Sequence, residues 1–332
     1  MSVEKIIADW KRKTFKPVYW LEGEEEYFID KAIDYAEHHI LNESESSFNL
    51  SVFYGKDANW ADVVNACRRY PMFAERQVVL LKEAQQMKDV EKLETYMENP
   101  LSSTVFVVSY KEKKLDARKK FARLVKEKGE LVSTKKMYDS KLPEWTQEML
   151  QTKGLTITQK GLSLLVDHIG NDLTRIENEV DKLSVNLGKR THITEEDIEE
   201  YIGVSKDYNV FELQAALAAK DFARSIQIIR YFEANPKAGP IQLILPSLYS
   251  FFSKVFMVCG AGSNDEKAIA ASIGVNPYFM KDYMQAARLY KYSGVEKVLL
   301  LLHSYNLKSI GIGSTGTEDA SLLKEMVVKI MD

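Results

Sequence analysis

The chain has 332 residues and a mass of 38.0 kDa, a length that accommodates two or three domains with their own cores. Its net charge of −3 gives no overall electrostatic reason to expect tight binding to nucleic acid. Only two cysteines occur, Cys67 and Cys259, which argues against a disulfide framework or a zinc site and fits a reducing cytosol.

The N-terminal segment 1–17 lacks the apolar core and cleavage site of a secretory signal, and its pattern predicts an amphipathic helix. The longest apolar segments, 243–258 and 295–302, are interrupted by Pro246 and Lys254 or are too short to cross a bilayer. We therefore expect a soluble, cytoplasmic protein that makes no contact with a membrane.

Up to residue 140, short β-type segments alternate with helical ones, which is typical of βαβ units and a largely parallel sheet. The expected strands are 18–21, 48–54, 77–81, 104–109 and 130–133, with helices at 25–40, 60–69, 88–97 and 117–128. This order predicts a doubly wound α/β domain over residues 1–140.

After Pro143 the apolar spacing changes to about 3.6 residues, which indicates helices for the rest of the chain. Thr158 and Thr194 are expected helix caps, and Thr194 begins a capping box with Asp197. We predict a small helical domain over 141–208 and an all-α domain over 209–332. The helices expected in the latter are 211–219, 222–233, 240–258, 265–273, 277–289, 295–309 and 318–331.

The first strand is followed by Glu22 and Gly23 as a turn and by a helix over 24–36, the arrangement that precedes a nucleotide phosphate in many ATPases. A phosphate-binding loop at this position carries G-x-x-x-x-G-K-[ST], whose N–H groups, Lys and hydroxyl hold the phosphates and magnesium. Here three carboxylates, Glu24 to Glu26, would repel a polyphosphate, although they suit a helix N-terminus. Glu83, after the strand 77–81, cannot replace the missing loop. No bound cofactor is therefore expected.

Other catalytic motifs are also absent from the sequence. The five histidines do not fall at metal-binding spacing, and no G-x-S-x-G elbow occurs, so we expect neither a metal nor a catalytic residue. A literal G-x-G-x-x-G at Gly311, Gly313 and Gly316 follows a helical segment and lies near the chain end, so we interpret it as an interhelical loop.

The segment 111–128 holds nine Lys or Arg residues against three acidic ones. The favoured interpretation is a solvated helix with its apolar side chains against the sheet, because aromatic residues that stack on bases are not interleaved. The alternative is contact with a phosphate backbone. The residues for such a contact are Lys113, Lys114, Arg118, Lys119 and Lys120.

Three large apolar side chains, Tyr70, Met72 and Phe73, cluster beside Pro71 between a helix and a strand. Pro71 stops the helix, so the cluster should project at a tip of the domain. Aromatic and Met side chains there have the composition of an interface hot spot, but a buried loop plug fits the composition equally well.

Five blocks, in order along nearly the whole chain, resemble the delta subunit of bacterial DNA polymerase III, the clamp-loader subunit that opens the sliding clamp. They are LEGEEEYFID at 21–30, PMFAERQVVLL at 71–81, KKLDARKKF at 113–121, the Gly, Asp, Asn and Glu pattern at 170–183, and IGVNPYFMKDYMQAARLY at 273–290. The sequence departs from the family at Asn306 and in the segment 311–319.

The resemblance implies an AAA+-like α/β domain with a degenerate nucleotide site, a helical lid and a helical collar. It implies no intrinsic catalysis in a subunit of a DNA-directed DNA polymerase holoenzyme. The implied partners are the sliding clamp (beta subunit), the gamma/tau ATPase and delta-prime subunits, and primer-template DNA through the complex. Met72 and Phe73 match the family's Leu-Phe pair, with Tyr70 adjacent, which favours an exposed clamp-binding tip. The alternatives are an active AAA+ ATPase and a helical interaction module outside replication.

Overall fold

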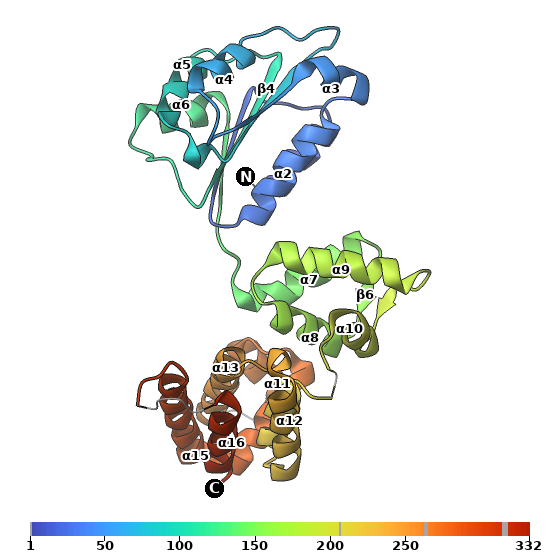
Figure 1. Ribbon diagram of the computed structural model, residues 1–332, viewed down its shortest axis with the longest axis vertical. Helices are drawn as coiled ribbons and strands as arrows, with labels where there is room; N and C mark the ends of the chain where they lie inside the picture. The colour runs from blue at the N-terminus through green and yellow to red at the C-terminus, as the bar shows by residue number, and fades with distance from the viewer. Residues whose placement is uncertain (1, 206, 262–264, 314–317) are drawn as a thin grey trace. The chain divides into compact units, whose positions relative to one another are not determined.

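The computed structural model describes residues 2–205, 207–261, 265–313 and 318–332, and the chain forms two compact units (Figure 1). The first unit spans residues 1–138 and the second spans 139–332. The expected α/β class followed by all-α structure is confirmed. The three-domain boundaries, including the division at residue 208, stay predictions.

The first unit contains a five-stranded sheet in the order β2-β3-β4-β1-β5. Every neighbouring pair is parallel, with Val18 opposite Phe106 and Tyr19 opposite Glu130. The strands are β1 (Val18–Gly23), β2 (Leu50–Tyr54), β3 (Gln77–Lys82), β4 (Thr104–Lys111) and β5 (Glu130–Thr134). The predicted parallel sheet is therefore confirmed, and its first strand lies inside the sheet, between β4 and the edge strand β5.

Helices cover both faces of this sheet (Figure 1). Because side chains alternate along a strand, Trp20 packs toward one set of helices, α4 (Trp60–Cys67), α5 (Glu94–Met97) and α6 (Lys120–Lys128). Tyr19 and Leu21 pack on the other face, against α1 (Val3–Lys11) and α2 (Glu26–His39). The near-continuous apolar strands thus follow from burial on both faces.

Two local predictions in this unit are wrong. Residues 48 and 49 were expected to begin a strand but end a helix, α3 (Glu43–Asn49), which starts with a capping box between Asn42 and Glu45. The basic segment is not helical from residue 117, because Asp116 accepts the N–H of Arg118 in a turn and α6 starts at Lys120. Short 3₁₀ turns, η1 (Ala84–Gln86) and η2 (Val90–Leu93), precede α5.

The second unit opens with η3 (Asp139–Lys141) and four helices, α7 (Leu142–Thr152), α8 (Gln159–Ile169), α9 (Leu173–Leu187) and α10 (Glu195–Ile202). Both predicted caps are confirmed: Thr158 accepts the N–H of Gly161, and Asp197 accepts the N–H of Thr194 at 2.9 Å. Two short parallel strands, β6 (Thr156–Ile157) and β7 (His192–Ile193), were not anticipated, since two residues carry no periodicity.

The remaining helices of this unit pack mostly around one large apolar core, and residues 266–273 pack in a smaller one. They are α11 (Val210–Ala218), α12 (Phe222–Ala234), α13 (Ile241–Gly260), α14 (Glu266–Ile273), α15 (Met280–Ser309) and α16 (Asp319–Met331), with η4 (Pro236–Ala238) and η5 (Pro277–Phe279). Lys291, at φ 56° and ψ 175°, divides α15 where two helices were predicted. Gly311 and Gly313 lie between α15 and α16, whereas Gly316 falls outside the described residues.

Residues 236–260, which include α13, are long and apolar enough by composition to span a membrane, with a mean hydropathy of 1.5. The expectation that Pro246 and Lys254 interrupt this segment is wrong, because the helix continues through both. Its buried side chains, such as Leu248 and Phe252, pack against the other helices of the unit. That packing is the arrangement of a core helix.

Candidate functional site

Parallel α/β sheets usually bind their ligands at the carboxyl ends of their strands, and in this chain that position is the end of β1. This strand lies between β4 and β5, and its end leads into α2. The prediction that Glu22 and Gly23 form a turn is wrong, because both residues belong to the strand. The place where an ATPase would hold a nucleotide phosphate is therefore occupied by regular strand pairing in this chain.

Glu22 is buried, with only 3% of its surface exposed. Its carboxylate accepts the N–H of Leu115 at 2.8 Å and the hydroxyl of Ser133 at 2.8 Å. Buried Glu25 accepts the N–H of Met137 at 3.4 Å in the same way. A buried charge needs hydrogen-bond partners, and these two carboxylates find theirs in the segments after β4 and β5. Their role is therefore structural.

Lys111, the last residue of β4, brings three carboxylates together beside this strand end. Its ammonium lies 2.8 Å from Asp30, 3.1 Å from Glu83 and 3.3 Å from Glu26. Burial lowers the pKa of Lys111, but the hydrogen bonds to Asp30 and Glu83 outweigh it, and the pKa is raised above its usual value. Lys111 therefore stays charged and satisfies its own chain's acids instead of a ligand.

Gly23 shows how closely β5 approaches this site. Its φ is +123°, and a Cβ added there would lie 2.1 Å from the carbonyl oxygen of Thr134. Only glycine has both this backbone conformation and room for that contact. The end of β1 is therefore closed by β5 on one side.

The connection between α4 and β3 is a second candidate binding site, because it carries the predicted tip of Tyr70, Met72 and Phe73. At its base, the side-chain amide of Gln77 donates to the carbonyls of Ala66 and Arg69. The helix ends at Cys67, before the proline, because these buried contacts and the Arg68 cap take over its last carbonyls.

The structure exposes all three tip side chains and so decides the question of plug or projection that composition left open. Tyr70 is 76% exposed, Met72 54% and Phe73 99%. Phe73 also has φ +54°, a left-handed conformation that costs a non-glycine residue about 1–2 kcal/mol. A large apolar side chain held outward by a strained backbone is typical of a binding site.

Near the tip, α3 contributes two residues that the sequence did not single out. Phe48 is 70% exposed, while the adjacent Asn49 is buried at 3% and hydrogen-bonds to the backbone of Met72. The segment was expected to be a strand, and no local pattern indicates a contact across 23 residues. Lys111 was missed likewise, as one lysine among many.

The basic segment is less available than its composition suggests. Asp116 and Arg118 pair within the turn, which lowers the pKa of Asp116. Lys114 is exposed, and the other four residues proposed for phosphate contact have partners. These are the carbonyl of Gln85 for Lys113, Asp116 for Arg118, Glu91 for Lys119, and Glu94 and Glu98 for Lys120. Local acids therefore neutralise much of this surface.

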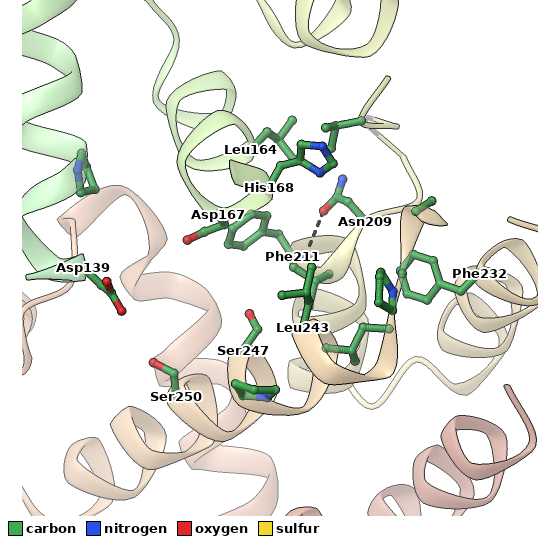
Figure 2. Close-up of a pocket in the computed structure, with 18 of the residues that line it drawn as sticks. Asp139, Leu164, Asp167, His168, Asn209, Phe211, Phe232, Leu243, Ser247 and Ser250 are labelled. Atoms are coloured by element: carbon green, nitrogen blue, oxygen red, sulfur yellow. Dashed lines mark hydrogen bonds between the residues drawn. The ribbon is translucent and has the colours of Figure 1, made fainter. Parts of the chain in front are cut away.

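A cavity of about 570 Å³ lies in the second unit, between α8 and α13 (Figure 2). Leu164, Asp167 and His168 line one side, and Ser247 and Ser250 another. Burial, together with Arg175, lowers the pKa of His168, so this imidazole is neutral at pH 7. Burial also raises the pKa of Asp167 to about 7, and Lys254 lines the same cavity.

Among the described residues, no group of three or more His, Cys, Asp or Glu side chains is placed to hold a metal ion. Burial raises the pKa of the Cys67 thiol well above its usual value, which leaves it an unreactive thiol.

A parallel α/β unit followed by a helical unit is the AAA+-like fold class predicted from the sequence, and the connection between α4 and β3 carries an exposed hydrophobic tip. Comparison with known families makes the assignment specific: residues 19–135 match the family described as DNA polymerase III, delta subunit. The resemblance to this family seen in the sequence blocks is confirmed.

Individual relatives agree with this assignment. The chain is 26% identical to DNA polymerase III subunit delta of Bacillus subtilis, over 95% of this chain and 93% of that protein. It is 24% identical to the probable delta subunit of Aquifex aeolicus, over 81% of each. The solved structure of the B. subtilis DNA clamp loader delta protein aligns over 99% of both chains, at 25% identity and a TM-score of 0.53.

Proposed function

We propose that this chain is the clamp-loader subunit that binds and opens the ring-shaped sliding clamp, and that Tyr70, Met72 and Phe73 form the contact. The observation that carries the proposal is Phe73, which is 99% exposed at φ +54°. Its aromatic ring gains nothing from the fold at that exposure, whereas a pocket on a partner would bury it. Gel filtration of the chain with the host's sliding clamp tests the proposal, since a stable complex should elute ahead of both components.

Opening of the clamp is a shift of population between closed and open rings. A ligand shifts such an equilibrium only by its differential affinity for the two states. The tip must therefore bind a clamp surface that is better formed in the open ring. The chain needs no chemistry of its own for this step, because binding free energy at the tip does the work.

The other partners follow from membership of a loader complex. We propose that the helices of the second unit assemble with the gamma/tau ATPase and delta-prime subunits in the cytoplasm. Primer-template DNA is reached through that complex, with Lys113, Lys114, Arg118, Lys119 and Lys120 as the residues proposed to contact phosphate. The ion pairs of Lys119 and Lys120 would have to exchange for such contacts, so we expect the isolated chain to bind DNA weakly.

Purified protein should neither bind nor hydrolyse ATP. The carboxylates of Glu26, Asp30 and Glu83 already surround Lys111, and the first turn has no lysine or hydroxyl for phosphate and magnesium. Isothermal titration with Mg-ATP is therefore expected to give no heat of binding, and phosphate release should equal the buffer blank. Binding in the micromolar range would instead favour an active ATPase.

A further inference from the structure

Asn49, the last residue of α3, connects that helix to the tip through its side-chain amide. Its Oδ1 accepts the N–H of Met72 at 2.7 Å, and its Nδ2 donates to the carbonyl of Met72 at 2.9 Å. One amide thus binds both backbone groups of a single residue. This two-point contact fixes the orientation of the Met72 backbone, which a single hydrogen bond would leave free to rotate.

The same amide is anchored on its own side. Nδ2 also donates to the carbonyl of Glu45, one turn back in α3, at 3.0 Å. Both amide hydrogens are then used, and Asn49 is only 3% exposed, so water does not replace these partners. The capping box of Asn42 and Glu45 holds the start of this short helix. Met72 is therefore tied to a fixed element of the first unit.

Met72 directly precedes Phe73, whose positive φ has to be maintained by its surroundings. The Phe73 side chain is 99% exposed, so packing of the ring cannot maintain it. The backbone on both sides therefore imposes the conformation: Asn49 holds Met72 on the N-terminal side, and on the C-terminal side Arg76 lies over the Phe15 ring. Release of Met72 would let Phe73 relax toward ordinary φ values and turn its ring away.

We propose that Asn49 is the positioning residue of the tip, which keeps Met72 and Phe73 in the conformation that the clamp binds. The inference deepens the proposed function and rests on it for the identity of the partner. The contact between Asn49 and Met72 does not depend on any partner, however. The positioning role and the proposed function can therefore be tested separately. Asn49 itself need not touch the clamp.

The test is surface plasmon resonance of the full chain on immobilised sliding clamp. Asn49→Ala removes both bonds to Met72, so only a fraction of molecules holds the competent conformation. We expect an association rate roughly tenfold slower with a nearly unchanged dissociation rate. Asn49→Asp keeps an acceptor but lacks the donor and should show the same loss. The matched control Asn99→Ala, at an exposed asparagine of the same unit, should bind like the wild type.

Two further measurements separate positioning from general damage to the fold. In a Phe73→Ala background, Asn49→Ala should have less than about a twofold effect, because it acts through the ring that is already absent. Hydrogen exchange without clamp should show faster exchange at the Met72 amide and unchanged protection in β3 and β4. Wild-type association rates for Asn49→Ala, or equal losses with and without Phe73, would overturn the inference. Failure of wild-type protein to bind clamp would refute the proposed function, while exchange at Met72 would still decide the role of Asn49.

Discussion

Replacement of Met72 and Phe73 together by alanine is expected to abolish measurable binding to the sliding clamp. Exposed aromatic and Met side chains that enter a partner's pocket each contribute about 2 kcal/mol or more to binding. Loss of about 4 kcal/mol weakens the complex on the order of 1,000-fold. Fluorescence titration of labelled clamp with the variant measures this loss directly.

The same change should leave folding intact, because the side chains of Met72 and Phe73 are 54% and 99% exposed. The free energy of unfolding in urea should lie within about 0.5 kcal/mol of the wild type. Tyr138→Ala is the control, since it removes another exposed aromatic side chain of the first unit and should not affect binding. Clamp affinity of the Met72 and Phe73 variant equal to that of the wild type would show that the contact surface lies elsewhere.

Gly23→Ala should produce the largest loss of stability among single substitutions at the end of β1. The new Cβ would meet the carbonyl oxygen of Thr134 at 2.1 Å, and alanine is strained at φ +123°. Overpacking and backbone strain together should lower the free energy of unfolding by about 3 kcal/mol. Urea denaturation monitored by circular dichroism gives this difference.

Gly260→Ala provides the matched comparison, because this glycine ends α13 and a Cβ there would meet nothing within 4 Å. We expect its stability to be equal to or slightly above that of the wild type. If Gly23→Ala were as stable as Gly260→Ala, β5 would not approach β1 as closely at Gly23 as the structure shows.

The strands and most helices of the first unit were predictable because their apolar patterns are local. Residues 78–81 and 105–108 are continuous apolar runs, which is how strands buried on both faces appear in a sequence. The helix α3 was not predictable in this way. Its cap at Asn42 resembles loop chemistry, and Phe48, which suggested a strand, is exposed on the helix.

The position of the tip was predictable, since Pro71 excludes a helix through residues 70–73, although α4 already ends at Cys67. Its support was not, because Asn49 reaches Met72 across 23 residues and a hydrogen bond to backbone carries no sequence signal. The basic segment shows the opposite error. Its charge was visible in the sequence, but its ion pairs were not. Lys119 and Lys120 pair with Glu91, Glu94 and Glu98, which lie 22 or more positions earlier in the chain.

The ion cluster of Lys111 with Glu26, Asp30 and Glu83 has a consequence for regulation. In a nucleotide-driven unit, an empty site and a filled site favour different conformations, and the ligand chooses between them. Here the chain itself supplies both the positive and the negative charges of the site, the Lys111 ammonium and three carboxylates. The site is therefore filled by its own side chains once the unit has folded. We therefore expect no nucleotide-dependent change at this site that could move the tip. If the tip binds the clamp as we propose, we expect other subunits of the loader to determine when it is engaged.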